Sequence, residues 1–407
     1  MTGPDEPSSS PASSPAGGPA GDAPGKPAGD APAGDSPGKP PSSDVEAIEL
    51  RIVRLRLLDP VITAYGVEAD RPVLLVRVRT TTGDGWGECA ALPEPGYSAE
   101  YVDGAWAVLV DHLLPRLAPT STAAELCSLL AGVRGHEMAK SAVHLALLDA
   151  ELRSAGRSLS ATLGASRREI GLGVTIGIQP TVGDAVRLAG EWVGLGYRHL
   201  KLKIRPGTDV EPARAVRAAH PDISLAVDAN GSYATNDPAL DALDALGLDL
   251  IEQPLAADDL LGHRDLTRSL VTPIGLDETI TSVGIAEAVA SLGLASAVAL
   301  KPGRLGGVDV AADLARRMHD AGVATWVGGM YETAIARAAN LALAALPTVT
   351  LPPDWSGSER YWATDVAPGL TAVDGRLAVP TGPGLGVNVD VAVLDELTVR
   401  RYEYRVG

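Results

Sequence analysis

Residues 198–204 read RHLKLKI, a short apolar run in which polar residues close a predicted strand. Runs of the same kind recur as GLGVTIGI (171–178), ISLAVDAN (223–230), LDLIEQP (248–254), TPIGLDE (272–278), SAVALKPG (296–303), VATWVGG (323–329) and VTLPP (349–353). Helical stretches such as DAVRLAGEWVGLG (184–196) and GVDVAADLARRMHDAG (307–322) separate them. Strands that lead into helices at a period of about 25 residues predict a parallel sheet, either doubly wound or closed into a (β/α)8 barrel. Eight runs favour the barrel, so we expect an α/β fold with a barrel domain over residues 169–383.

The chain before the barrel reads differently, because its apolar residues first alternate with charged ones and then repeat at helical spacing. The alternating stretches are IELRIVRLRLL (48–58) and RPVLLVRVRTTT (71–82), and the helical ones are YVDGAWAVLVDHLLPRL (101–117) and HEMAKSAVHLALLDAELRSAG (136–156). Alternation predicts half-buried antiparallel strands, and strands followed by helices predict an α+β domain. We expect this domain to span residues 45–168, with the alternating C-terminal segment 384–407 packing back on it.

Residues 1–44 cycle through Pro, Gly, Ala, Ser and Asp, and after Met1 they contain no Leu, Ile, Val or aromatic residue. Such a segment cannot bury enough apolar surface to offset the entropy lost on ordering. We therefore expect a disordered tail that takes no part in any chemistry.

The chain has 407 residues, enough for two or three domains, and carries 51 acidic against 34 basic residues. A net charge of −17 argues against a nucleic-acid partner, because such proteins need a basic face to displace counterions from phosphates. No apolar run approaches the ~20 residues that span a bilayer, and the N-terminus lacks the basic and apolar regions of a signal peptide. Two cysteines cannot form a disulfide framework, so we expect a cytoplasmic protein that does not associate with membranes.

Charged residues close five consecutive runs at nearly equal spacing. Lys203, Asp228, Glu252, Asp277 and Lys301 follow one another at intervals of 25, 24, 25 and 24 residues. The carboxyl ends of barrel strands meet at one face, where the active site of such barrels lies. The spacing therefore predicts that these side chains converge there.

Carboxylates gathered in one cleft repel one another unless a cation neutralises them. A set of oxygen donors without His or Cys suits a hard ion, so we expect Mg²⁺, for which Mn²⁺ or another divalent ion can substitute. The flanking lysines are then candidate bases, and the metal would bind a substrate carboxylate while a proton leaves the adjacent carbon. Asn230 and Glu278, beside two of the carboxylates, are candidates for orienting the ligands.

The motifs KLKI, VDANG, IEQP, LDE and LKPGRLGG resemble those of the enolase superfamily, in its muconate-lactonizing branch. The later segments WVGGMYETAIARAANLALAALP and TLPPDWSGSERYW are similar to o-succinylbenzoate synthases related to N-acylamino acid racemases. The resemblance covers roughly residues 48–400, almost all of the chain outside the tail. It implies an α+β capping domain followed by a modified barrel, (β/α)7β.

The resemblance also implies roles for single residues. Asp228, Glu252 and Asp277 match the metal ligands of the family. Lys203 matches one acid/base and Lys301 the opposite one, while Lys201 matches a supporting lysine that tunes Lys203.

Further positions match the substrate pocket of the family. Arg304 matches a position associated with relatives that also racemise N-acylamino acids. Gly329, Met330 and Glu332 fall at the strand end that shapes the pocket. The stretches 65–72, which begins with Tyr65, and 94–101 resemble two loops that close over the ligand.

The implied reaction removes a proton α to the carboxylate of a small-molecule substrate, and we expect a homo-oligomeric enzyme. We expect syn dehydration to o-succinylbenzoate in menaquinone biosynthesis, with racemisation of N-succinylamino acids as an additional activity or, alternatively, the main one. Muconate cycloisomerase and dipeptide epimerase activities are less favoured. Outside the family, a Schiff-base aldolase would also place a lysine on the sixth barrel strand, and a non-catalytic binding barrel is a further alternative.

Overall fold

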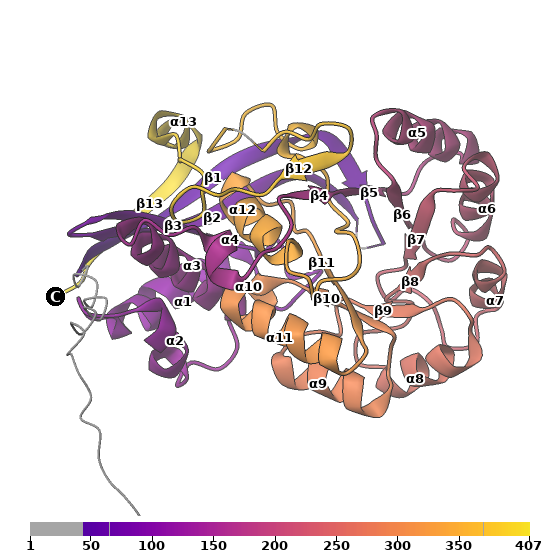
Figure 1. Ribbon diagram of the computed structural model, residues 1–407, viewed down its shortest axis with the longest axis horizontal. Helices are drawn as coiled ribbons and strands as arrows, with labels where there is room; N and C mark the ends of the chain where they lie inside the picture. Colours follow the sequence, from indigo (N-terminus) through magenta and orange to yellow (C-terminus); the bar gives the residue numbers. More distant parts are fainter. Residues whose placement is uncertain (1–43, 65, 369) are drawn as a thin grey trace, which may run out of the picture. The chain divides into compact units, whose positions relative to one another are not determined.

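A computed structural model describes residues 44–64, 66–368 and 370–407 of the protein (Figure 1). The predicted disordered tail, residues 1–44, lies outside the described residues except for Asp44, and Tyr65 lies outside them too. The described residues form one compact unit. The division of this unit into a capping domain at 45–168 and a barrel domain at 169–383 stays a prediction.

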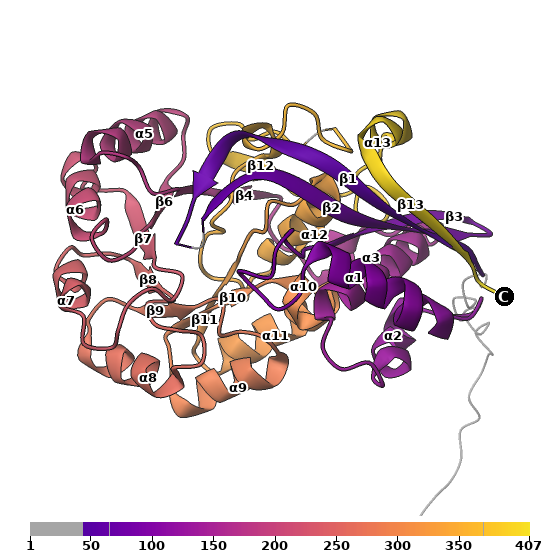
Figure 2. The same cartoon turned by 180° about the vertical axis from the view of Figure 1, so that it is seen from behind.

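An antiparallel sheet with strand order β13-β1-β2-β3 is built from both ends of the described chain. Its strands are β1 (Val45–Ile62), β2 (Val67–Thr80), β3 (Gly83–Cys89) and β13 (Thr398–Arg405). The last strand pairs with the first, so that Arg405 lies opposite Ala47 (Figure 2). The C-terminal segment thus completes a sheet that the N-terminal strands begin.

Helices cover one face of this sheet and pack through a shared apolar core. They are α1 (Val102–Val108), a π-helical turn (Leu109–Leu113), a 3₁₀ turn (Leu114–Arg116), α2 (Ala123–Leu130) and α3 (Glu137–Ser154). Helix α4 (Leu159–Leu163) follows, and its buried leucines belong to the other large apolar core. Helix α3 lies directly on β3, where a Cβ at Gly87 would stand 1.9 Å from the carbonyl oxygen of Ala142. Glycine is therefore required for this close approach. No helix in the described ranges is long and apolar enough to cross a membrane.

We expect Gly87→Ala to lower the free energy of unfolding by about 3 kcal/mol, because the new methyl group meets helix backbone that cannot move aside cheaply. Chemical denaturation measures this value. Gly132→Ala is the matched control, since no atom lies within 4 Å of the position of its added Cβ. Equal stability of the two variants would contradict the packing described here.

A curled parallel sheet with strand order β11-β10-β9-β8-β7-β6-β5 carries the rest of the fold. Its strands are β5 (Gly173–Ile176), β6 (His199–Lys203), β7 (Ser224–Asp228), β8 (Leu250–Glu252), β9 (Ile274–Leu276), β10 (Ala297–Leu300) and β11 (Ala324–Val327). Figure 1 shows α5 to α9 and α11 along the outer side of this sheet. The predicted α/β fold, a capping sheet followed by a modified barrel, is confirmed.

The remaining elements connect or cover the parallel strands. The helices are α5 (Val182–Gly194), α6 (Val210–Ala219), α7 (Pro238–Asp244), α8 (Leu260–Ser269), α9 (Val283–Leu292), α10 (Pro302–Leu305), α11 (Val308–Asp320), α12 (Ala334–Ala344), α13 (Val391–Leu397) and a 3₁₀ turn (Ser358–Arg360). Two short strands, β4 (Glu169–Gly171) and β12 (Arg376–Ala378), pair with each other beside the parallel sheet.

The expectation of an eighth strand at residues 349–353 is wrong, because this segment has no strand structure. It still bridges the two edges of the parallel sheet. The N–H of Leu351 donates to the carbonyl of Thr325 in β11 (3.0 Å), and the carbonyl of Pro353 accepts from the N–H of Gly173 in β5 (2.9 Å). Two consecutive prolines lack the N–H groups that a ladder needs, so the segment closes the barrel without forming a strand.

Candidate active site

The strand register brings the predicted site residues to one end of the parallel sheet. Lys203, Asp228 and Glu252 lie opposite one another at the ends of β6, β7 and β8. Glu252 in turn lies opposite Gly275 in β9, and Asp277 stands two residues beyond Gly275. Side chains alternate along a strand, so a step of two residues returns Asp277 to the same face.

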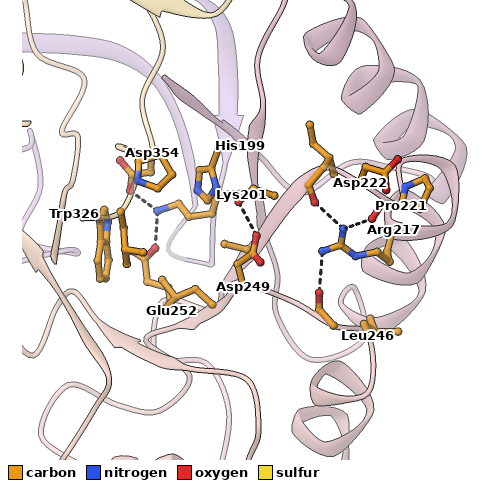
Figure 3. Close-up of a pocket in the computed structure, with 17 residues that line it drawn as sticks. His199, Lys201, Arg217, Pro221, Asp222, Leu246, Asp249, Glu252, Trp326 and Asp354 are labelled. Carbon is orange, nitrogen blue, oxygen red and sulfur yellow. Dashed lines mark hydrogen bonds and ion pairs between the residues drawn. The ribbon is translucent and has the colours of Figure 1, made fainter. Parts of the chain in front are cut away.

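Lys201 is a buried cation held among carboxylates (Figure 3). Its Nζ donates to Oε2 of Glu252 (2.8 Å) and to Oδ2 of Asp354, and it forms an ion pair with Oδ2 of Asp228 (3.2 Å). Burial would lower the pKa of Lys201, but Asp354, Glu252 and Asp228 outweigh it and raise the pKa well above its ordinary value. Lys201 is therefore a permanent charge rather than a base.

Lys203 has a different set of partners, and one of them is an amide. Its Nζ donates to Oδ2 of Asp228 (2.6 Å) and to Oδ1 of Asn230 (2.9 Å). The Nδ2 of Asn230 donates to Oε1 of Glu278 (2.8 Å). Asn230 thus links Lys203 to Glu278, and the expected role of both residues in orienting the metal ligands stays a prediction.

Lys301 follows β10 and shares its partners with Arg304. Lys301 Nζ donates to Oδ2 of Asp277 (2.8 Å), and Arg304 Nη2 donates to Oδ1 of the same carboxylate (2.7 Å). Burial would raise the pKa of Asp277, but Arg304 and Lys301 hold it well below its usual range. This carboxylate is therefore ionised and fixed from both sides.

Tyr97 completes this side of the site, and sequence reasoning did not single it out. Its hydroxyl accepts from Lys301 Nζ (2.7 Å) and Arg304 Nη1 (2.6 Å), and donates to Oδ2 of Asp277 (3.0 Å). Its place inside the expected ligand-covering stretch 94–101 was the available signal. The capping side of the molecule therefore contributes a polar group to the strand ends.

The three candidate metal ligands are buried, and their pKa values differ. Burial would raise the pKa of Asp228, but Lys203 and Lys201 outweigh it and lower the pKa to about 2. Burial and the neighbouring charge of Asp228 raise the pKa of Glu252 well above its ordinary value, with Lys201 opposing. Repulsion of this kind is what a bound cation relieves.

The chemistry of these side chains fits a hard divalent cation, because all their donor atoms are carboxylate oxygens. Across the described residues, no group of three or more His, Cys, Asp or Glu side chains is already arranged to hold a metal ion. Basic side chains instead supply the positive charge around these carboxylates. Asp228 pairs with the ammonium groups of Lys201 and Lys203. Asp277 pairs with the ammonium group of Lys301 and the guanidinium group of Arg304.

A cavity of about 510 Å³ adjoins Asp228, Asp277 and the lysines, whereas Glu252 lines a different cavity. The strand ends and the loops that follow them contribute Lys201, Lys203, Asp228, Asn230, Asp277, Lys301, Gly329 and Met330 to its wall, and Asp354, after the segment 349–353, lines it too. The expected ligand-covering stretches contribute the residues from Gly66 to Asp70 together with Glu94, Gly96 and Tyr97. The volume and the mixed lining are typical of a small-molecule site.

Glu332, expected at the pocket, does not line this cavity. Its Oε1 accepts from the N–H of Met330 (2.7 Å) and from Nδ2 of Asn340 (3.0 Å), and its Oε2 is paired with Arg337 (3.3 Å). Glu332 therefore holds the backbone of Met330, which does line the cavity.

A second buried carboxylate ties the antiparallel sheet to this loop. Glu88 in β3 accepts from the N–H (3.0 Å) and the hydroxyl (2.6 Å) of Thr333, the residue that precedes α12. Burial, chiefly, raises the pKa of Glu88 to about 8, and the charge of Glu332 adds to this rise.

This raised pKa predicts a pH dependence of stability. The folded protein keeps a proton on Glu88 up to about pH 8, whereas the unfolded chain loses it near pH 4.5. Between these values the folded state binds more protons, so its stability falls as pH rises, by up to about 1.4 kcal/mol per pH unit. Denaturation of the wild type and of Glu88→Gln from pH 5 to 8 measures this slope. The variant should lack that share of it, and identical slopes would contradict the assignment.

Comparisons with known proteins place the chain in a family. Residues 47–164 match the mandelate racemase / muconate lactonizing enzyme N-terminal domain, and residues 184–393 match the enolase C-terminal domain-like family. The chain is 46% identical to the N-succinylamino acid racemase of an Amycolatopsis species over 365 residues, covering 88% of this chain and 98% of the relative. It is 40% identical to the o-succinylbenzoate synthase of Geobacillus kaustophilus over 364 residues, covering 87% and 96%.

The solved structures agree with these matches. A member of the enolase superfamily from Listeria innocua superposes with a TM-score of 0.86 at 36% identity, covering 90% of this chain and all of that one. Enzymes of this superfamily generally use a divalent metal ion. With matches over both the capping sheet and the barrel, the protein belongs to the enolase superfamily of enzymes.

Proposed function

We propose that the protein is a Mg²⁺-dependent enzyme that removes the proton α to a carboxylate, acting as an o-succinylbenzoate synthase. One observation carries the proposal most strongly. Lys203 at the end of β6 and Lys301 after β10 flank the carboxylates of the intervening strands, and both line one cavity. Relatives at 40% and 46% identity are named for o-succinylbenzoate synthesis and for N-succinylamino acid racemisation.

Asp228, Glu252 and Asp277 would hold the Mg²⁺ ion. When bound, the ion would supply positive charge that stabilises the substrate carboxylate as its α proton leaves. Asp277 is already fixed by Arg304, so its orientation does not depend on the metal. The ammonium group of Lys201 donates to Oε2 of Glu252 and offsets the charge of that carboxylate.

For the dehydration, Lys203 Nζ would take the α proton and later return a proton to the departing hydroxyl group. Lys301 would stay an ammonium group and stabilise the negative charge that develops on the substrate. The hydrogen bonds of Lys301 to Tyr97 and Asp277 support this role, because both partners hold its Nζ at the cavity wall.

Racemisation of N-succinylamino acids is the second candidate, and the 46% identity to a racemase favours it. The same two lysines would then act in turn. One would take the α proton from one face of the substrate, and the other would deliver a proton to the opposite face. The same arrangement of lysines serves both reactions.

The test compares kcat/KM for the cyclohexadiene precursor of o-succinylbenzoate with kcat/KM for N-succinyl amino acids. Each assay is run with Mg²⁺, after EDTA treatment, and after Mg²⁺ is restored. The proposal expects dehydration that EDTA abolishes and Mg²⁺ restores. Turnover of the N-succinyl amino acids alone would assign the protein to racemisation, and no turnover of either substrate with Mg²⁺ would overturn the proposal.

A further inference from the structure

A second cavity, of about 780 Å³, opens at the other end of the parallel strands (Figure 3). His199, Ser224 and Leu250, the first residues of β6, β7 and β8, line its outer part. Ala226 and Trp326 also line it, and they belong to an interior cluster that contains the small side chains Ala297 and Ala299. Bulkier branched side chains are usual in the interior layers of such barrels.

Lys201 and Asp354 line both this lower cavity and the catalytic cavity. The ion pair between them therefore forms part of the wall that separates the two cavities. Figure 3 shows Lys201 lying between Asp354 and Glu252, with its ammonium group bonded to each.

Asp354 is itself held firmly. Its Oδ1 accepts from the N–H of Gly329 (3.0 Å), and its carbonyl accepts from the hydroxyl of Thr175 (2.7 Å). It directly follows the proline-rich segment that bridges β11 and β5. The segment that closes the barrel thus holds the Asp354 carboxylate in a fixed position beside Lys201.

We propose that Asp354 is a positioning residue for the metal site, because it binds the Lys201 ammonium from below and offsets its charge. This inference rests on the proposed function, since it concerns the ion that Asp228 and Glu252 would hold. Asp354 was not singled out by sequence reasoning.

The physical reason lies in how an ammonium group shares its protons. Lys201 has three N–H donors and three carboxylate neighbours, Asp354, Glu252 and Asp228. Without Asp354, the ammonium group would bind the other two carboxylates more closely. The site would also carry one negative charge fewer beside the metal position, and both effects oppose binding of a dication.

The test measures the dissociation constant of Mn²⁺, as a probe for Mg²⁺, by isothermal titration calorimetry of the full-length protein. Asp354→Asn should weaken binding roughly tenfold or more. Asp249→Asn is the matched control. Asp249 also lines the lower cavity, but its carboxylate accepts from Ser224 and from the N–H of Leu225. This control should bind Mn²⁺ as the wild type does.

A double variant separates the charge effect from a general structural one. Lys201→Gln with Asp354→Asn removes one charge of each sign, so it should bind Mn²⁺ more tightly than Asp354→Asn alone, close to the wild type. Circular dichroism checks that each variant is folded. If Asp354→Asn unfolds, the double variant is compared with Lys201→Gln instead: equal Mn²⁺ affinity supports an effect through Lys201, and much weaker binding by the double variant overturns the inference.

The outcomes are distinct. Wild-type affinity in Asp354→Asn, or a double variant as weak as the single one, would overturn the inference. Failure of the wild-type protein to bind Mn²⁺ would instead overturn the proposed function.

Discussion

Lys203→Ala is expected to stop proton exchange from one enantiomer of an N-succinyl amino acid while sparing the other. Lys301→Ala should show the reverse preference. Lys203 and Lys301 flank the carboxylate cluster, so each would reach one face of the α-carbon. Each variant should lower the affected exchange rate by roughly 10³-fold, the scale on which a positioned acid/base contributes. Proton NMR in D₂O follows both enantiomers separately.

Both substitutions should also end dehydration, for different reasons. Lys203→Ala removes the group that moves the protons, and Lys301→Ala removes the positive charge that faces the substrate. Lys140→Ala is the matched control, because Lys140 pairs with Glu137 at the start of α3 and is the one lysine outside the site among the described residues. Equal exchange of both enantiomers by either site variant would mean that the proton carriers are misassigned.

Glu252→Gln is expected to reduce turnover by roughly 10³-fold or more and to weaken binding of the divalent ion. Glu252 is 1% exposed and bonded to Lys201, so the amide removes one charge from a buried cluster and leaves its shape nearly unchanged. Steady-state kinetics over a range of Mg²⁺ concentrations measures both effects.

Glu287→Gln on α9 is the control for this substitution, because Glu287 lies at the surface in an ion pair with Arg317. It should keep wild-type kinetics. Full activity of Glu252→Gln at low Mg²⁺ would remove Glu252 from the metal ligands.

The sequence predicted the strand ends well because each of them is a local pattern. Each pattern is an apolar run that ends in a charged residue, and the runs repeat at a constant period. In a parallel barrel this places the charged residues at the carboxyl ends of the strands, where the active site lies. The register of β6, β7 and β8 aligns Lys203, Asp228 and Glu252 accordingly. Their assignment as base and metal ligands stays a prediction.

The sequence did not reveal the groups that reach the site from elsewhere. Tyr97 comes from a loop before α1, and its contact with Lys301 spans 204 positions. Asp354 follows a segment with the apolar pattern of a strand, but consecutive prolines prevent the ladder and the closing hydrogen bonds are irregular. The first contact depends on how the loop before α1 packs on the strand ends and the second on the closure of the barrel, and neither follows from a local period.

The most direct test of the central claim follows loss of the α proton in metal-free protein and again after Mg²⁺ is added. The cyclohexadiene precursor and N-succinyl amino acids serve as substrates, and NMR in D₂O reports both dehydration and exchange. The account predicts no α-proton loss until Mg²⁺ is present, and then rapid loss from at least one substrate. Equally fast α-proton loss in the metal-free protein, or none at saturating Mg²⁺, would contradict it.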